Sequence, residues 1–203
     1  MRSKLILMLS LVIGLASDLS AFDPKSMKDC RLAFLLGLGW GDGGNAVFGS
    51  KEHDREFERV ARACAKDRGA SDAELRGDAW REKVISALHA ANDPEKRIAA
   101  SMNDSLKEAF GADVWRRIDV VSAYVAGAYA RHGTDSGFRM INQAKGTYLV
   151  LVIQLFASVR INLAINPGMP GNLIITLSGG GKDELADFFA EMRTIREVIE
   201  RAK

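Results

Sequence analysis

The sequence has little of what marks several specialised classes of protein. Two cysteines among 203 residues are too few for a small disulfide-dense scaffold, and four prolines are too few for a collagen-like chain. The net charge of +2 provides no basic surplus for a polyanion, so we expect no nucleic-acid partner. What is present, 47% hydrophobic and 27% charged residues, is typical of a globular protein with a sizeable core.

Patterns that identify catalytic centres are also scarce. The three histidines, His53, His89 and His132, show none of the spacings of a zinc site, so we expect neither a metal nor a cofactor. The Gly-x-Ser-x-Gly elbow of α/β-hydrolases does not occur. These absences lean toward a protein without catalysis, but they leave the question of an enzyme open.

The chain begins like an export signal. Arg2 and Lys4 precede an apolar run over Leu5–Ala16, and a more polar stretch follows, which is the order of a secretory signal peptide. The run is shorter than the roughly 20 residues that a membrane-spanning helix needs. We expect residues 1–21 to be the signal, cleaved after Ala16 or Ala21, and the mature protein to reach the periplasm or the extracellular medium.

One later stretch, Tyr148–Val159, raises the membrane question again. It contains Gln154 and is followed by Arg160, so no window of membrane length is free of polar groups. We therefore expect no integral membrane segment after signal removal. Part of the stretch, Tyr148–Phe156, suits either a third strand or a buried helix, because periodicity does not separate these in a short apolar run.

Helical periodicity dominates from Ser26 to about Gly146. Ser71 with Glu74 fits a capping box, and Asp93-Pro94 is another helix start. Helices are predicted over Ser26–Leu38 and Glu52–Arg68, and core-facing stripes run through Ile98–Phe110 and Val114–Ala128.

Past Gly146 the period changes. Apolar residues alternate over Val159–Ile165, strong turn formers fill Asn166–Asn172, and a β-branched run occupies Leu173–Leu177, which together predict a β-hairpin. Asp183–Arg201 then reads as an amphipathic helix. The predicted fold is α+β and mainly α-helical. It comprises one domain over residues 22–203, with a helical bundle and a C-terminal hairpin of two or three strands covered by the final helix.

The two cysteines predict a disulfide. An exported chain with an even count allows one intramolecular pair, Cys30 with Cys64. The two cysteines lie on predicted helices joined by a glycine-rich connection, so a helical hairpin would bring them to similar height. Such a bond would stabilise the fold by about 2–4 kcal/mol. The competing interpretation, a redox or catalytic cysteine, has no Cys-x-x-Cys pair to support it.

Two glycine-rich segments are candidate sites. Around Trp40, Asp42 and Asn45, close to His53, glycines would let a ligand or partner approach the backbone, with Trp40 stacking on it. An interhelical turn whose Trp40 packs on the core is the favoured interpretation, because glycines are common where helices end. The second segment, ahead of the last helix, could form an anion-binding nest, although a capping and hinge role is favoured because Asp183 would repel an anion. The residues of that nest are Gly179, Gly180, Gly181 and Lys182.

Two hypotheses of function follow. The leading one is an exported envelope protein, periplasmic in location, that binds another envelope protein as an inhibitor, immunity factor, chaperone or adaptor. Its contacts are expected in the Gly37–Ser50 loop or the Asn166–Asn172 loop. The alternative is a small envelope enzyme or ligand-binding protein that uses the loop around Trp40 and Asp42.

Overall fold

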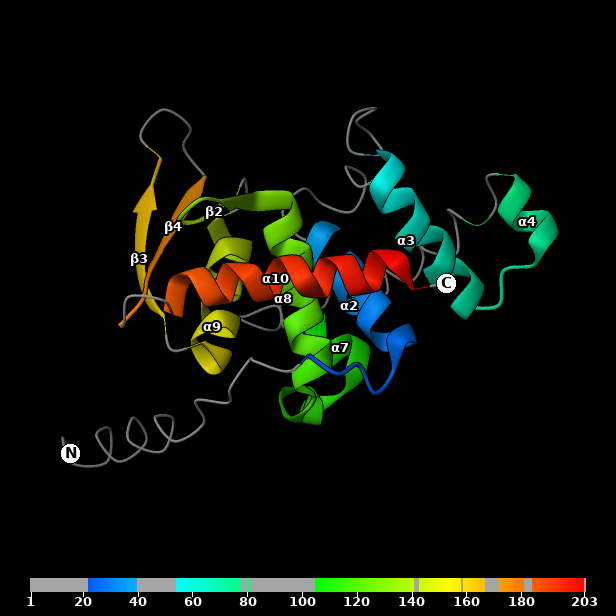
Figure 1. The fold of residues 1–203 in the computed structure, drawn as a ribbon, viewed down its shortest axis with the longest axis horizontal. Helices are drawn as coiled ribbons and strands as arrows, with labels where there is room; N and C mark the ends of the chain where they lie inside the picture. The colour runs from blue at the N-terminus through cyan, green and yellow to red at the C-terminus, as the bar shows by residue number, and fades with distance from the viewer. Residues whose placement is uncertain are drawn as a thin grey trace.

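The computed structural model describes residues 22–39, 54–77, 80, 105–140, 143–157, 159–166, 172–180 and 184–202. Within these ranges the helices are α2 (Met27–Gly39), α3 (Asp54–Asp67), α4 (Asp72–Arg76), α7 (Ser105–Phe110), the 3-10 helix η2 (Ala112–Arg116), α8 (Ile118–His132), α9 (Gln143–Phe156) and α10 (Glu184–Arg201). The strands are β1 (Gly133–Thr134), β2 (Gly137–Met140), β3 (Arg160–Ile165) and β4 (Leu173–Ser178). Figure 1 shows the sheet at one end of the molecule and α4 at the other.

Helices α2 and α8 form the centre of the core. Residues 30–38 of α2 and 119–128 of α8 are buried without interruption, as expected for helices enclosed on all sides. The two backbones touch where they cross. A Cβ atom placed on Gly127 would overlap the carbonyl oxygen of Phe34, and one placed on Gly37 would overlap that of Tyr124. Glycine at both positions therefore sets the distance between the helices.

The sheet is antiparallel and has the order β1-β2-β4-β3. The predicted hairpin is confirmed as β3 and β4, in a register that pairs Leu163 with Ile175. The sheet also contains β1 and β2, which the sequence did not predict, because two and four residues are too short to display an alternating pattern. The observed fold is thus mixed helix and sheet and mostly helical, with four strands in the described residues.

The apolar run that suited either a strand or a helix is helical, and it forms α9. Tyr148, Leu149, Val152 and Ile153 are buried between α8 and the sheet. The ring of Tyr148 meets that of Tyr124 edge-on at 6.0 Å. Because α9 is covered by α8 on one side and by β2 and β4 on another, its sequence is apolar almost all round and has little helical periodicity.

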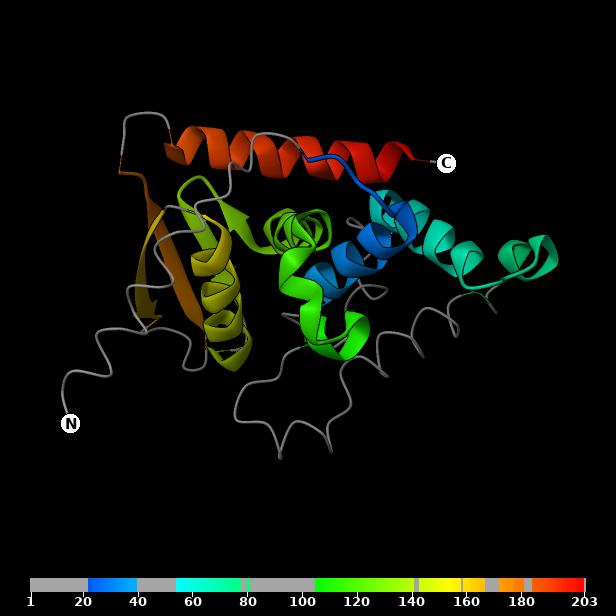
Figure 2. The same ribbon diagram turned by 90° about the horizontal axis from the view of Figure 1, so that it is seen from below.

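The last helix buries the face that its pattern predicts. Phe188, Phe189, Met192, Ile195 and Ile199 are buried. The ring of Phe189 stacks on Tyr129 at 5.0 Å. The helix lies mainly along α8, α3 and α2, whereas α9 makes the closer contacts with the sheet, as Figure 2 shows. The hairpin is therefore covered chiefly by α9, not by the final helix.

Two smaller predictions have different outcomes. The capping box of Ser71 and Glu74 is confirmed at the start of α4. The helix start at Asp93-Pro94 lies outside the described residues.

In the part of the chain that the structure describes, no helix combines the length and the apolar character needed to cross a membrane.

The expected disulfide between Cys30 and Cys64 is wrong, because both side chains are buried free thiols that do not lie near each other. The start of α2 does lie beside the end of α3, since Arg31 forms an ion pair with Asp67 at 2.8 Å. The error is in the rotation of α2 about its axis. Cys30 is turned by about 100° from Arg31, so its Sγ faces α8, where Asp119 Oδ2 is 3.8 Å away.

Candidate functional site

The glycine-rich loop singled out by the sequence lies outside the described residues. Trp40, Asp42, Asn45 and His53 all fall between the end of α2 and the start of α3. Its role as a ligand or partner loop stays a prediction.

The second candidate, the nest before α10, is described only in part. The backbone N–H of Gly180 donates a hydrogen bond to Glu184 Oε2 at 2.6 Å. A carboxylate of the chain itself therefore occupies this donor, as in a helix cap. Gly179 is also described, whereas Gly181 and Lys182 are not, so the favoured capping role and the anion-binding alternative of the whole segment both stay predictions.

The described residues contain no group of three or more His, Cys, Asp or Glu side chains placed to hold a metal ion. His132 is buried at the end of α8, and Asp119 is buried at its start.

The two cysteines sit in surroundings that keep their thiols protonated. Burial, reinforced by the nearby Asp119 carboxylate, raises the pKa of Cys30 from 9.0 to about 12. Burial also raises the pKa of Cys64 to about 11, although the nearby Arg68 guanidinium acts in the opposite direction. Because the thiolate is the reactive form of cysteine, both residues are poor nucleophiles and behave as small core residues.

We expect both thiols to be free and shielded in the purified protein. Alkylation of the folded protein at neutral pH should be slow, whereas alkylation in guanidinium without a reductant should label both, as intact mass would show. An unfolded protein that takes up no label would show that a disulfide is present.

The raised pKa of Cys30 makes the stability of the protein depend on pH. The unfolded chain loses this proton first as pH rises, so the free energy of unfolding should fall above about pH 9.

A surface that the sequence did not single out lies on β3, the outermost strand of the sheet. Leu163 is 50% exposed and Ile165 is 56% exposed. Both pair with buried residues of β4, Leu163 with Ile175 and Ile165 with Leu173. Directly opposite residues of antiparallel strands share a face of the sheet. The side chains on this face are therefore buried where β4 carries them, whereas Leu163 and Ile165 on β3 are exposed. The alternating pattern predicted that these side chains share a face, but not that the face is uncovered.

The backbone of β3 is also open on its outer side. Beyond the last strand pair, the N–H of Asn166 donates to the carbonyl oxygen of Asn172 at 3.1 Å. Hydrogen-bonded and non-hydrogen-bonded pairs alternate along an antiparallel ladder. The even-numbered residues of β3 therefore bond to β4, and Ile161, Leu163 and Ile165 direct their N–H and C=O groups outward. In the described part of the chain no strand pairs with this edge. We call Ile161–Ile165 the open edge.

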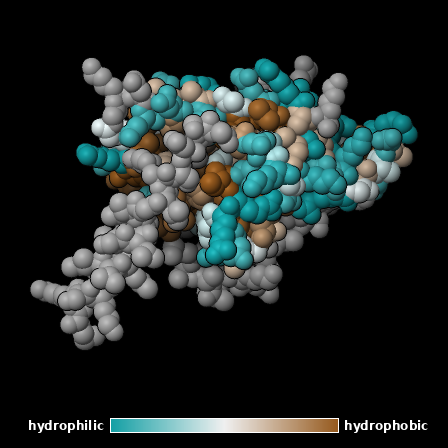
Figure 3. Space-filling model, turned by 60° about the horizontal axis from the view of Figure 1, so that its bottom comes forward, coloured by the Kyte–Doolittle hydropathy of each residue, from teal (hydrophilic) through white to brown (hydrophobic). Residues whose placement is uncertain are grey.

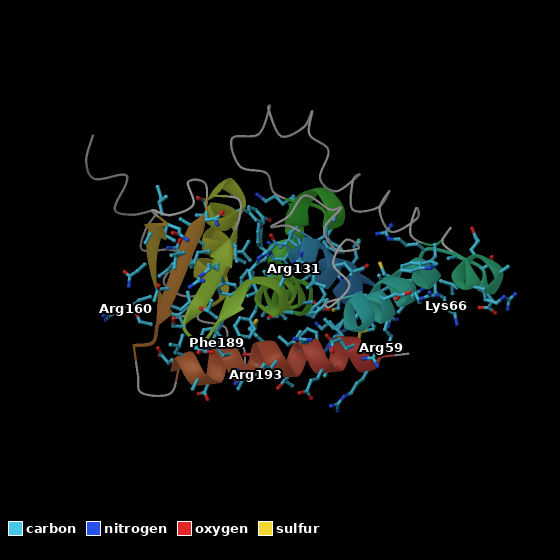
Figure 4. All side chains as sticks on the ribbon, turned by 90° about the horizontal axis from the view of Figure 1, so that it is seen from above. Arg59, Lys66, Arg131, Arg160, Phe189 and Arg193 are labelled. Atoms are coloured by element: carbon cyan, nitrogen blue, oxygen red, sulfur yellow. The ribbon has the colours of Figure 1, made fainter. Side chains whose placement is uncertain are left out.

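The open edge carries little charge. Arg160, at its start, is the only ionisable residue in β3, and β4 has none. Figure 4 shows Arg160 at the sheet end of the molecule, far from Arg59 and Lys66. In the view of Figure 3, hydrophobic surface lies in separate patches among hydrophilic residues, some of it toward the sheet end.

Comparison with known proteins shows no family model, curated protein or solved structure that matches the chain. Its function therefore has to be argued from the geometry and chemistry of its own residues. Of the features described, the open edge is the one that combines exposed apolar side chains with unpaired backbone donors and acceptors.

Proposed function

We propose that the chain is an exported envelope protein that acts by binding protein, and that its partner adds an extended segment to the open edge of β3. The observation that carries this proposal is the combination of outward backbone groups and exposed Leu163 and Ile165 on one strand. Strand addition uses these two features together: main-chain hydrogen bonds provide affinity, and alternate side chains provide specificity.

The edge also lacks the devices that usually prevent strand addition. Proteins protect exposed edges with lysine, proline, bulges or inward-pointing charges. Residues 161–165, Ile-Asn-Leu-Ala-Ile, contain no proline, glycine or charged residue, and their pairing with β4 is regular. An unprotected edge with two exposed aliphatic side chains is an aggregation hazard unless something covers it.

One of the two loops in which the sequence predicts contacts with a partner adjoins the open edge along the chain. The open edge ends at Ile165, and the Asn166–Asn172 segment follows directly. β3 pairs along its length with β4, and β4 packs in turn against α9. The strand therefore offers a preorganised template, which lowers the cost of ordering on binding.

Site-specific photo-cross-linking in cells tests this function. A photoreactive residue at position 163 or 165 should form a reproducible conjugate with another protein in the envelope fraction. The same residue in place of Val198, which is 37% exposed on α10, should not form it. Equal conjugates from position 198, or none from positions 163 and 165, would contradict the proposal.

A further inference from the structure

We infer that in the free protein the open edge pairs with the same edge of a second copy, giving a two-fold dimer with one continuous sheet. The inference rests on one premise of the proposed function, namely that the open edge accepts an added strand. The second copy occupies the edge until a partner displaces it, so self-pairing regulates the binding surface.

The pleat of the strand restricts how two copies can pair. Residues directly opposite each other must share a face, and outward-facing backbone groups must meet outward-facing groups. Ile161, Leu163 and Ile165 satisfy both conditions when the two-fold axis passes through Leu163. In that register Leu163 opposes its own copy, and each Ile161 opposes an Ile165. Three hydrogen-bonded pairs supply about six backbone hydrogen bonds between the copies.

The side chains support this register over its neighbours. It joins the two exposed large apolar residues of the strand, Leu163 and Ile165, into a single apolar row across both copies. An axis through Asn162 would place Ile165 opposite Val159, which is already buried. An axis through Ala164 would bring Pro167, which has no N–H, opposite Ile161.

Charge does not oppose the pairing. The only ionisable group of the strand, Arg160, lies opposite Asn166 of the other copy in this register. The two Arg160 positions are then six residues apart along the paired strands, or about 20 Å. That separation exceeds the screening length of about 8 Å at physiological ionic strength. An identical strand with an uncharged centre is thus a complementary partner for the edge.

The mass of the mature protein in solution, measured by light scattering after size exclusion, tests the inference. The wild type should be a dimer. Leu163→Lys should be a monomer with the same circular dichroism spectrum, because the side chain is half exposed and its replacement leaves the fold intact. Val198→Lys, the matched control on α10, should remain a dimer.

A cysteine variant tests the register. Opposing residues of a hydrogen-bonded pair have Cα atoms about 5.5 Å apart, within the range of a disulfide. Leu163→Cys should therefore give a covalent dimer on mild oxidation, whereas Thr176→Cys, exposed on β4, should not. Cys30 and Cys64 do not interfere, because they are buried.

A wild type that is monomeric at high concentration, or a dimer that survives Leu163→Lys and gives no Leu163→Cys cross-link, would overturn the inference. The proposed function would survive either result if position 163 still cross-links to a different envelope protein. It fails separately if that cross-link is absent.

Discussion

Replacing Gly127 with alanine should destabilise the protein by about 3 kcal/mol, the upper part of the range for overpacked cores. In an exposed helix the same change would stabilise by about 1 kcal/mol, because alanine is the better helix former. Here the added methyl group would overlap the backbone carbonyl of Phe34, which belongs to the facing helix. The clash cannot be relieved by a side-chain rotation, so α2 and α8 would have to move apart along a fully buried contact.

Urea unfolding followed by circular dichroism measures this effect. Gly37→Ala should show a loss of similar size, since its methyl group would overlap Tyr124 in α8. The losses of free energy should not add in the double variant, because one displacement of α2 from α8 relieves both overlaps. Gly77→Ala is the matched control. Its position is exposed, its φ is −97°, and the nearest atom to an added Cβ is 3.9 Å away, so stability should hardly change. An unchanged or higher midpoint for Gly127→Ala would contradict the close crossing.

Removing the carboxylate of Asp67 should cost about 3–5 kcal/mol, as expected for a buried ion pair that loses one member. Arg31 is 6% exposed, and its Nε lies 2.8 Å from Asp67 Oδ2. Arg31 Nη1 also donates a hydrogen bond to the carbonyl oxygen of Ala202 at 3.3 Å. One guanidinium therefore connects α2, α3 and the end of α10. Asp67→Ala leaves this cation buried with most of its compensation gone.

Replacing both members of the ion pair by apolar residues separates the ion pair from the packing. The pair Arg31→Met with Asp67→Leu should recover much of the loss caused by Asp67→Ala, since apolar replacement of a buried pair is often neutral or stabilising. Glu197→Ala, which breaks a pair with Arg201 whose side chains are 76% and 59% exposed, should change stability by less than about 1 kcal/mol. If Asp67→Ala costs no more than Glu197→Ala, the Arg31 contact does not hold the three helices together.

The sequence determined the elements that carry a periodic or local pattern of their own. The alternation over Val159–Ile165 predicted β3, and the 3.6-residue period near the C-terminus predicted α10 with its buried residues. The Ser71 capping box was local enough to be recognised from two residues. Each of these elements carries its own signal, because a period of two or 3.6 residues places the apolar side chains on one face. In α10 that face is buried, whereas in β3 it is largely exposed.

Elements without such a pattern stayed ambiguous until the structure resolved them. Helix α9 is apolar nearly all round, including Leu155 on its exposed side, so its sequence did not separate a helix from a strand. Strands β1 and β2 are too short to alternate visibly. β1 pairs with β2, and β2 pairs in turn with β4, which lies more than 30 residues further along the chain.

The candidate site shows the same division. Spacing along the helices placed Cys30 and Cys64 at similar heights, but whether they meet depends on the rotation of α2, and packing against α8 turned Cys30 to Asp119. The sequence by itself determined that Leu163 and Ile165 share a face. Only the tertiary structure decided that this face is uncovered, since β3 comes last in the sheet and α9 packs on β2 and β4. Exposure depends on which distant segment fills the space beside a strand, and a period of two residues contains no information about that neighbour.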